Sequence, residues 1–68
     1  MKKKFKVGDI ITFELVNQDV VGKIVEERGP LGLDGQMVYR VEVNFEAAEP
    51  MYFELEESSI SRAQAVHH

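Results

Sequence analysis

Apolar and polar side chains alternate along several short stretches of the chain, which is the pattern of β-strands that bury one face. Four stretches show it: residues 9–15, 20–27, 38–45 and 51–55. The third alternates most regularly, because its aromatic and branched side chains all fall on one side: Tyr39, Val41, Val43 and Phe45. A shorter closing strand is expected over residues 61–66. The pattern therefore predicts four or five short strands.

The segments between these stretches are rich in residues that form turns. Residues 28–36 hold three glycines and a proline, which predicts an irregular loop, and Asp34-Gly35 within it suits a turn with positive φ. Gly22, inside the second stretch, is expected to mark a bulge or a close approach of two backbones. Residues 56–60 are too few for a stable α-helix and predict a single 3₁₀ turn before the last strand.

Short strands at regular spacing, without any sustained 3.6-residue period, predict an all-β fold. Four to five antiparallel strands of this length favour a small barrel. The expected core consists of the inward-facing apolar residues: Val7, Ile11, Phe13, Val20, Ile24, Tyr39, Val41, Val43, Phe53, Leu55 and Ile60.

Length and composition add limits to this fold. A chain of 68 residues forms one domain at most, which buries about 60% of its unfolded surface. The absence of cysteine excludes disulfides and thiolate metal sites and fits a reducing compartment. No apolar run approaches the roughly 20 residues that cross a bilayer, so we expect a cytoplasmic protein without membrane contact.

The net charge of −4 is unevenly distributed. Four lysines precede the first strand: Lys2, Lys3, Lys4 and Lys6. All twelve carboxylates follow them and face only four basic residues. We therefore divide the chain into a basic arm (1–6), a barrel (7–66) and a tail or tag remnant (67–68). The acidic barrel is a poor match for nucleic-acid phosphates, and the arm is expected to be a loose, solvated terminus.

Residue types that carry catalysis are scarce. The only histidines are His67 and His68, too near the chain end to be held as general bases. Neighbouring carboxylates such as Glu26 and Glu27 face opposite sides of a strand, so they form no acid/base pair. The glycines of residues 29–35 lack the Gly-Lys-Ser/Thr that would bind phosphate. We expect no enzyme, no cofactor and no metal site.

Four short motifs carry a resemblance to a known fold: Phe5-Lys6-Val7-Gly8-Asp9-Ile10-Ile11, Gly22-Lys23-Ile24-Val25, Tyr39-Arg40-Val41 and Ser58-Ser59-Ile60. Together they resemble SH3-like barrels of the KOW, Tudor and related bacterial kind over residues 5–66. The loop Arg28-Gly29-Pro30-Leu31-Gly32 also looks like that of an uncharacterised family of short bacterial proteins. These motifs imply architecture and carry little information on function.

Two functional relatives follow from this resemblance. KOW-type domains bind RNA or polymerase-associated proteins through basic and aromatic positions, whereas the outward positions here are largely acidic or neutral. The type II dihydrofolate reductases share the Phe-Lys-Val-Gly-Asp opening, but their pore needs a Val-Gln-Ile-Tyr strand. The corresponding strand here reads Met51-Tyr52-Phe53-Glu54, so the resemblance does not extend to that activity.

Two surfaces are candidates for binding. Leu31 and Leu33 lie in the glycine-rich loop, where they either fold back over the barrel or await a partner. The second surface comprises the aromatic residues Phe5, Tyr39, Phe45 and Tyr52, of which Tyr39 is expected in the core and Tyr52 at the surface.

The leading hypothesis is a non-catalytic module that binds another protein or a second copy of itself. Its predicted contact residues are Leu31, Leu33, Tyr52, Glu54 and Glu56. The alternative is a nucleic-acid-associated domain that uses Lys2, Lys3, Lys4 and Lys6 with Arg28 and Arg40. A third hypothesis is a subunit whose partner strand or pore forms only on assembly.

Overall fold

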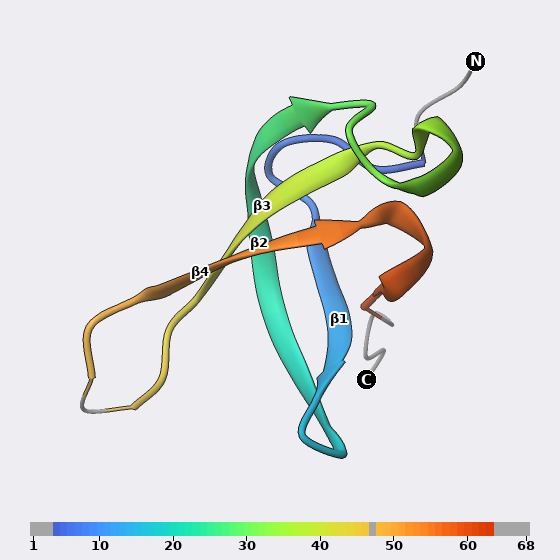
Figure 1. Cartoon of the computed structure of the whole chain (residues 1–68). Coiled ribbons are helices and arrows are strands. Elements are labelled where there is room, and N and C mark those ends of the chain that lie inside the picture. The colour runs from blue at the N-terminus through green and yellow to red at the C-terminus, as the bar shows by residue number, and fades with distance from the viewer. Residues whose placement is uncertain (1–3, 47, 64–68) are drawn as a thin grey trace, which may run out of the picture.

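The computed structural model describes residues 4–46 and 48–63, and these form five antiparallel strands and two 3₁₀ turns (Figure 1). The strands are β1 (Ile10–Leu15), β2 (Gln18–Gly29), β3 (Val38–Val43), β4 (Met51–Glu56) and β5 (Ile60–Arg62). The turns are η1 (Leu33–Gly35) and η2 (Glu57–Ser59). The predicted all-β class and the predicted 3₁₀ turn before the last strand are confirmed.

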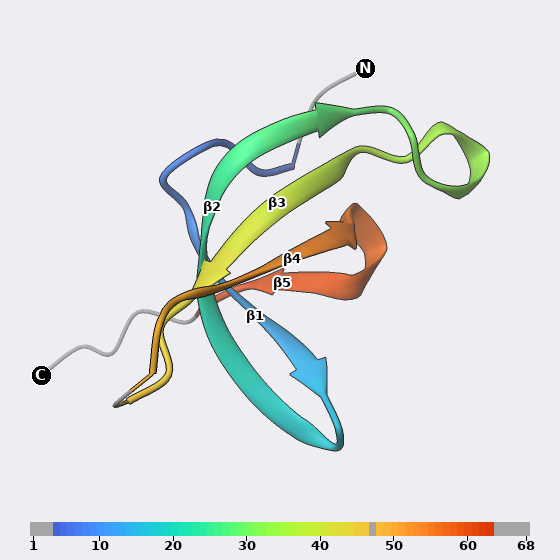
Figure 2. The same ribbon diagram turned by 60° about the vertical axis from the view of Figure 1, so that its left-hand side comes forward.

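The strands form one sheet in the order β4-β3-β2-β1-β5. The first four follow one another as a meander, and β5 returns to pair with β1, where Ile60 lies opposite Phe13. Figure 2 shows how strongly the sheet bends, so that β5 runs beside β4. Within the described residues β4 and β5 are not paired, so the sheet is not closed. This arrangement is compatible with a small barrel-like fold.

Gly22 allows β2 to pass close to β3. A Cβ at this position would lie 2.5 Å from Cγ1 of Val41 and 3.0 Å from the carbonyl oxygen of Glu42. The close approach expected from the sequence is therefore present. Further along β2, the pairing with β3 shifts between Ile24 and Glu26 and again between Glu27 and Gly29. These irregularities bend the strand, as bulges do.

The core lies on the inner face of the bent sheet. Its fully or nearly buried residues are Phe5, Ile11, Phe13, Ile24, Tyr39, Val41, Val43 and Ile60. Three further residues of the expected core are half-buried and pack against it: Val20, Phe53 and Leu55. The rings of Phe13 and Phe53, 5.3 Å apart between centroids, join β1 to β4 across this face.

Val7 was expected in the core, and this prediction is wrong. Its residue is 55% exposed, whereas Phe5, two residues earlier, is only 7% exposed. The cause is a turn in which the Asp9 amide donates to the Lys6 carbonyl at 3.0 Å, with Gly8 at φ 100°. This turn breaks the alternation on which the prediction relied.

Three element boundaries differ from those predicted. β2 extends two residues beyond the expected stretch at each end. The β1–β2 turn consists of Val16 and Asn17, at φ 50° and 62°, while Gln18 and Asp19, expected in the turn, already belong to β2. The closing strand covers Ile60–Arg62; residues 64–66 of the prediction lie outside the described part. No helix within that part is long and apolar enough to cross a membrane.

Candidate functional site

The outward-facing side chains of β4 form a row that leads to the loop between β2 and β3. Alternate residues of a strand face opposite sides of a sheet, so Phe53 and Leu55 pack towards the core. The outward residues are Tyr52, Glu54 and Glu56, here called the β4 row. Residues 29–35, here called the glycine loop, adjoin its Glu56 end. The five predicted partner-binding residues thus lie on one row and the loop that it meets.

Tyr52 begins the row and is exposed, as expected. Its hydroxyl donates to Oε2 of Glu42 at 3.0 Å, and the guanidinium carbon of Arg40 lies 4.7 Å from the ring centroid. The hydrogen bond to Glu42 and the charge of that carboxylate raise the pKa of Tyr52 above its usual value. Tyr52 is therefore contacted by a carboxylate at its hydroxyl and by a guanidinium over its ring.

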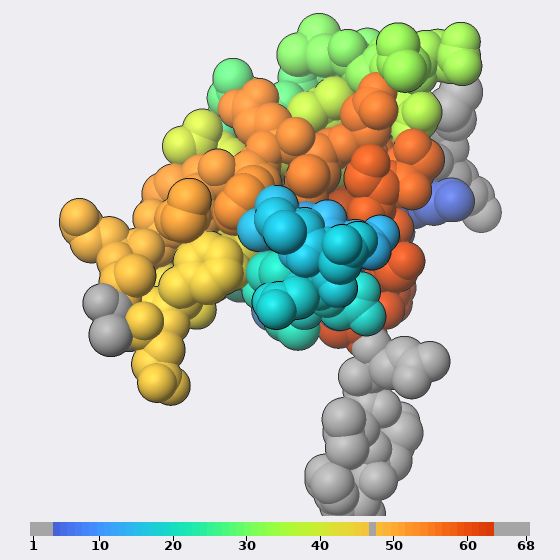
Figure 3. Space-filling model, turned by 60° about the horizontal axis from the view of Figure 1, so that its bottom comes forward, coloured from blue at the N-terminus to red at the C-terminus, as the bar shows by residue number. Residues whose placement is uncertain are grey.

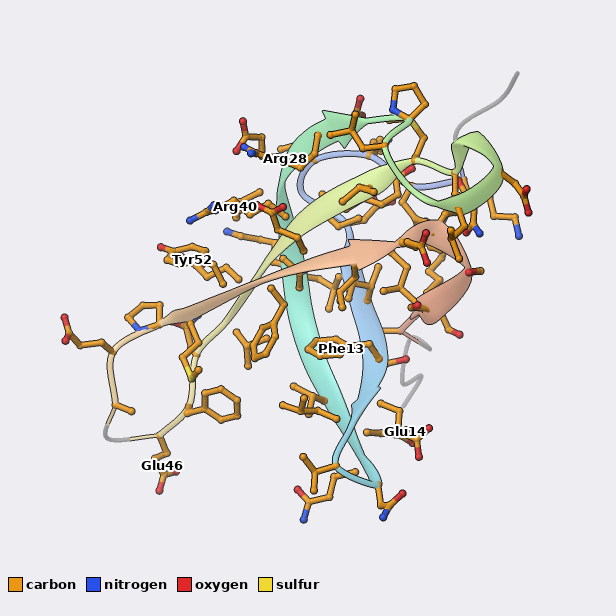
Figure 4. All side chains as sticks on the ribbon, viewed as in Figure 1. Phe13, Glu14, Arg28, Arg40, Glu46 and Tyr52 are labelled. Atoms are coloured by element: carbon orange, nitrogen blue, oxygen red, sulfur yellow. The ribbon has the colours of Figure 1, made fainter. Side chains whose placement is uncertain are left out.

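Glu54 lies in the middle of the row and meets two arginines. Its Oε2 is 3.6 Å from Nη1 of Arg40 and 3.5 Å from Nε of Arg28. Arg28 also contacts Oε1 of Glu26 at 3.3 Å through Nη1. In Figure 4 the side chains of Arg28, Arg40 and Tyr52 lie one below another on the same side of the sheet. Arg28 and Arg40, two of the positive charges proposed for nucleic-acid contact, thus lie within ion-pair distance of carboxylates.

Glu56 ends the row and fixes the glycine loop. Its Oε2 accepts a hydrogen bond from the Leu33 amide. A Cβ on Gly32 would lie only 2.6 Å from the same oxygen, so glycine permits this contact. Glu56 is therefore an anchor of the loop rather than a free charge.

Gln36 and Met37 connect the end of the loop to η2. The Gln36 side-chain oxygen accepts from the Ser58 amide at 3.0 Å. The Met37 carbonyl accepts from the Glu57 amide at 2.9 Å. Within the loop, the Gly32 amide donates to the Gln36 carbonyl at 2.9 Å. The segment expected to be an irregular loop contains η1 and is joined to η2 by hydrogen bonds.

Leu31 and Leu33 project from this loop. Their residues are 73% and 74% exposed, so neither folds back over the barrel. The second predicted surface does not form: Phe5 and Tyr39 are buried and Phe45 is half-buried. Of the four aromatic residues proposed for it, Tyr52 alone is exposed.

The basic arm is described from Lys4 onward, while Lys2 and Lys3 lie outside the described residues. The Tyr39 hydroxyl donates to the Phe5 carbonyl at 3.3 Å, and Nη2 of Arg62 donates to the Lys4 carbonyl at 2.9 Å. The Lys6 amide donates to Oδ2 of Asp9 at 3.1 Å. These contacts join Lys4, Phe5 and Lys6 to the sheet.

Candidate chemistry elsewhere in the described part of the chain is limited. Residues 4–46 and 48–63 hold no group of three or more histidine, aspartate or glutamate side chains that could bind a metal. His67 and His68 lie outside these residues.

Sequence reasoning did not identify Glu42 and Gln36 as parts of this surface. Glu42 matters because the β3–β4 register places it opposite Tyr52. Gln36 matters because its side chain accepts a hydrogen bond from the Ser58 amide, 22 residues later in the chain. Neither partner is marked by a local motif. Comparison of the chain with protein-family models, curated proteins and solved structures found no match.

Proposed function

We propose that this protein is a non-catalytic protein-interaction module that binds its partner through Leu31 and Leu33. One observation carries the proposal: two large apolar side chains are about three-quarters exposed on a loop whose backbone is anchored. Apolar residues displayed together on a surface are typical of interaction sites. An anchored loop loses little conformational entropy on binding, so more of the contact energy contributes to affinity.

The β4 row supplies the rim of the proposed interface. Tyr52 and Glu54 extend the surface along β4, and aromatic residues are enriched at interfaces while polar groups form their edges. Because the chain carries a net charge of −4, a partner with apolar side chains and a basic rim is the best complement.

We also propose that the fold is an SH3-like barrel. The strand order β4-β3-β2-β1-β5 and the 3₁₀ turn before β5 support this assignment. The bacterial origin and the cytoplasmic location implied by the sequence stay predictions.

The function is tested by quantitative pull-down from a lysate of the source cells. The wild-type chain is compared with a Leu31→Ser/Leu33→Ser variant, which removes the apolar contacts from exposed positions without touching the core. Val7→Ser is the matched control, because Val7 is another exposed apolar residue away from the loop. Proteins recovered by the wild type and the control should be lost with the double variant.

Equal recovery by all three proteins would overturn the role of the loop. RNA or DNA binding at low salt that disappears when residues 1–4 are deleted would favour the nucleic-acid hypothesis instead. That outcome is not expected, because Arg28 and Arg40 already face Glu26 and Glu54.

A further inference from the structure

The tip of the β1–β2 hairpin displays a side chain that its backbone disfavours. Val16 occupies the two-residue turn at φ 50°, a conformation that glycine, asparagine and aspartate adopt far more readily than a β-branched residue. It is also 85% exposed, more than any other large apolar residue of the described chain. A strained residue at an exposed tip is a reason to ask what it contacts.

The outer face of the same hairpin contains a hollow that could receive such a side chain. It has a volume of about 400 Å³ and is lined by Ile10, Val21, Gly22, Lys23, Glu42 and Asn44. Ile10 and Val21 are exposed and contribute apolar side chains to its lining. Small-molecule sites usually enclose most of their ligand, whereas this hollow is broad and open, which suits a protruding side chain of another macromolecule.

The tip and the hollow carry side chains of opposite charge that have no ion-pair partner within the described residues. Near the tip, Glu14 and Asp19 lie directly opposite each other on β1 and β2, and both are exposed. Lys23 lies at the hollow, opposite Ile10 on β1 and Glu42 on β3, and the Glu42 carboxylate accepts a hydrogen bond from the Tyr52 hydroxyl. Within residues 4–46 and 48–63, Glu14, Asp19 and Lys23 form no ion pair. Like charges directly opposite each other destabilise a strand pair. A basic side chain brought close to Glu14 and Asp19 would therefore be favourable.

The tip and the hollow are placed so that, in a pair of chains, the tip of each can contact the hollow of the other. Figure 1 shows the hairpin projecting away from the other strands, and in Figure 3 its tip faces the reader. Val16 lies six residues from Ile10, about 20 Å along the strand. A two-fold axis across the outer face, midway along this distance, brings each Val16 onto the hollow of the other copy. The long side chain of Lys23 then reaches towards the acidic pair of that copy.

We propose that the protein forms a symmetric dimer through the outer faces of two antiparallel β1–β2 hairpins, each inserting Val16 into the hollow of the other. Both chains use the same patch, so the contact is complete with two copies. Each chain contributes few apolar side chains, so the interface is small and a dissociation constant of about 0.1–1 mM is expected. This surface and this partner are distinct from those of the proposed function.

The dimer is tested by sedimentation and by backbone amide NMR over a concentration series. The mass should rise above the 7.8 kDa of one chain, and concentration-dependent shifts should fall on residues 10–23 and not on residues 29–35. Val16→Asn should abolish both effects while the spectrum stays folded, because asparagine tolerates the turn conformation. Leu31→Ser/Leu33→Ser should leave them unchanged, which separates this proposal from the proposed function.

A charge exchange gives the sharper test. Lys23→Glu alone and Glu14→Lys/Asp19→Lys alone should each be monomeric, because like charges then meet at both contacts. An equimolar mixture of the two variants should form a mixed dimer that added salt weakens. A wild-type chain that stays at 7.8 kDa, a dimer that persists in Val16→Asn, or a mixture that stays monomeric would each overturn the proposal.

Discussion

The glycine loop and the β1–β2 turn both hold apolar side chains at the surface, but their backbones are supported in different ways. In the loop, positive φ angles fall on Gly29, Asp34 and Gly35, which adopt them readily. The Leu33 amide donates a hydrogen bond to Glu56, and Gln36 and Met37 accept hydrogen bonds from η2, which fixes the course of the loop. In the β1–β2 turn Val16 and Asn17 take positive φ, between strands that pair up to Leu15 and Gln18.

The two exposed apolar sites are therefore held in place in different ways. The glycine loop is held by hydrogen bonds to residues far away in the sequence. Removing one of these contacts should therefore destabilise the loop conformation. The β1–β2 turn is held against the preference of Val16, so its stability should rise when that residue is replaced. The two regions should therefore respond to substitution with opposite signs.

The largest effect is expected from Gly32→Val. The new Cβ would lie 2.6 Å from Oε2 of Glu56 and 3.1 Å from the Gln36 carbonyl. Both neighbours hold the loop, so its anchor must open, at an expected cost of about 2–3 kcal/mol in the free energy of unfolding. Urea unfolding measures it, and an unchanged midpoint would show that the loop is not anchored as described.

Glu56→Ala should produce a smaller loss by removing the acceptor of the Leu33 amide. We expect about 1–2 kcal/mol of destabilisation and faster amide exchange at Leu33. Glu56→Gln is the control, because its side-chain oxygen can accept the same hydrogen bond. If alanine and glutamine gave equal effects, the charge of Glu56, and not its hydrogen bond, would hold the loop.

The same contrast explains which features could be predicted from the sequence. Alternation around Tyr39 and Val41 predicted β3, and Asp34-Gly35 predicted positive φ, because in both cases local preference and final structure agree. Gly22 was recognised for the same reason. These residues carry their structural role in their own chemistry.

The parts that were missed depend on distant residues or on conflict with local preference. Glu56 accepts a hydrogen bond from the Leu33 amide across 23 positions, and no local pattern predicts this contact. Phe5 replaces Val7 in the core because the Lys6–Asp9 turn interrupts the alternation before β1. The break between the first two strands was expected at Asn17-Gln18-Asp19, and the strand register places the turn on Val16 and Asn17.

The smallest and most selective effect is expected from Val16→Asn, which should stabilise the fold. An L-residue pays roughly 1–2 kcal/mol in the left-handed region, and asparagine relieves part of this through its short polar side chain. We expect a gain of about 0.5–1 kcal/mol, measured by thermal unfolding in dilute solution, where self-association does not contribute. In a domain of this size the gain corresponds to a rise in Tm of a few degrees.

Val7→Asn makes the same chemical change at an exposed position without positive φ, so it should bring no such gain. Equal shifts in the two variants would mean that replacing an exposed apolar side chain by a polar one, and not relief of backbone strain, sets the stability at Val16. A gain confined to Val16→Asn, together with loss of self-association, would show that the valine is retained at the tip for contact and against the preference of the turn.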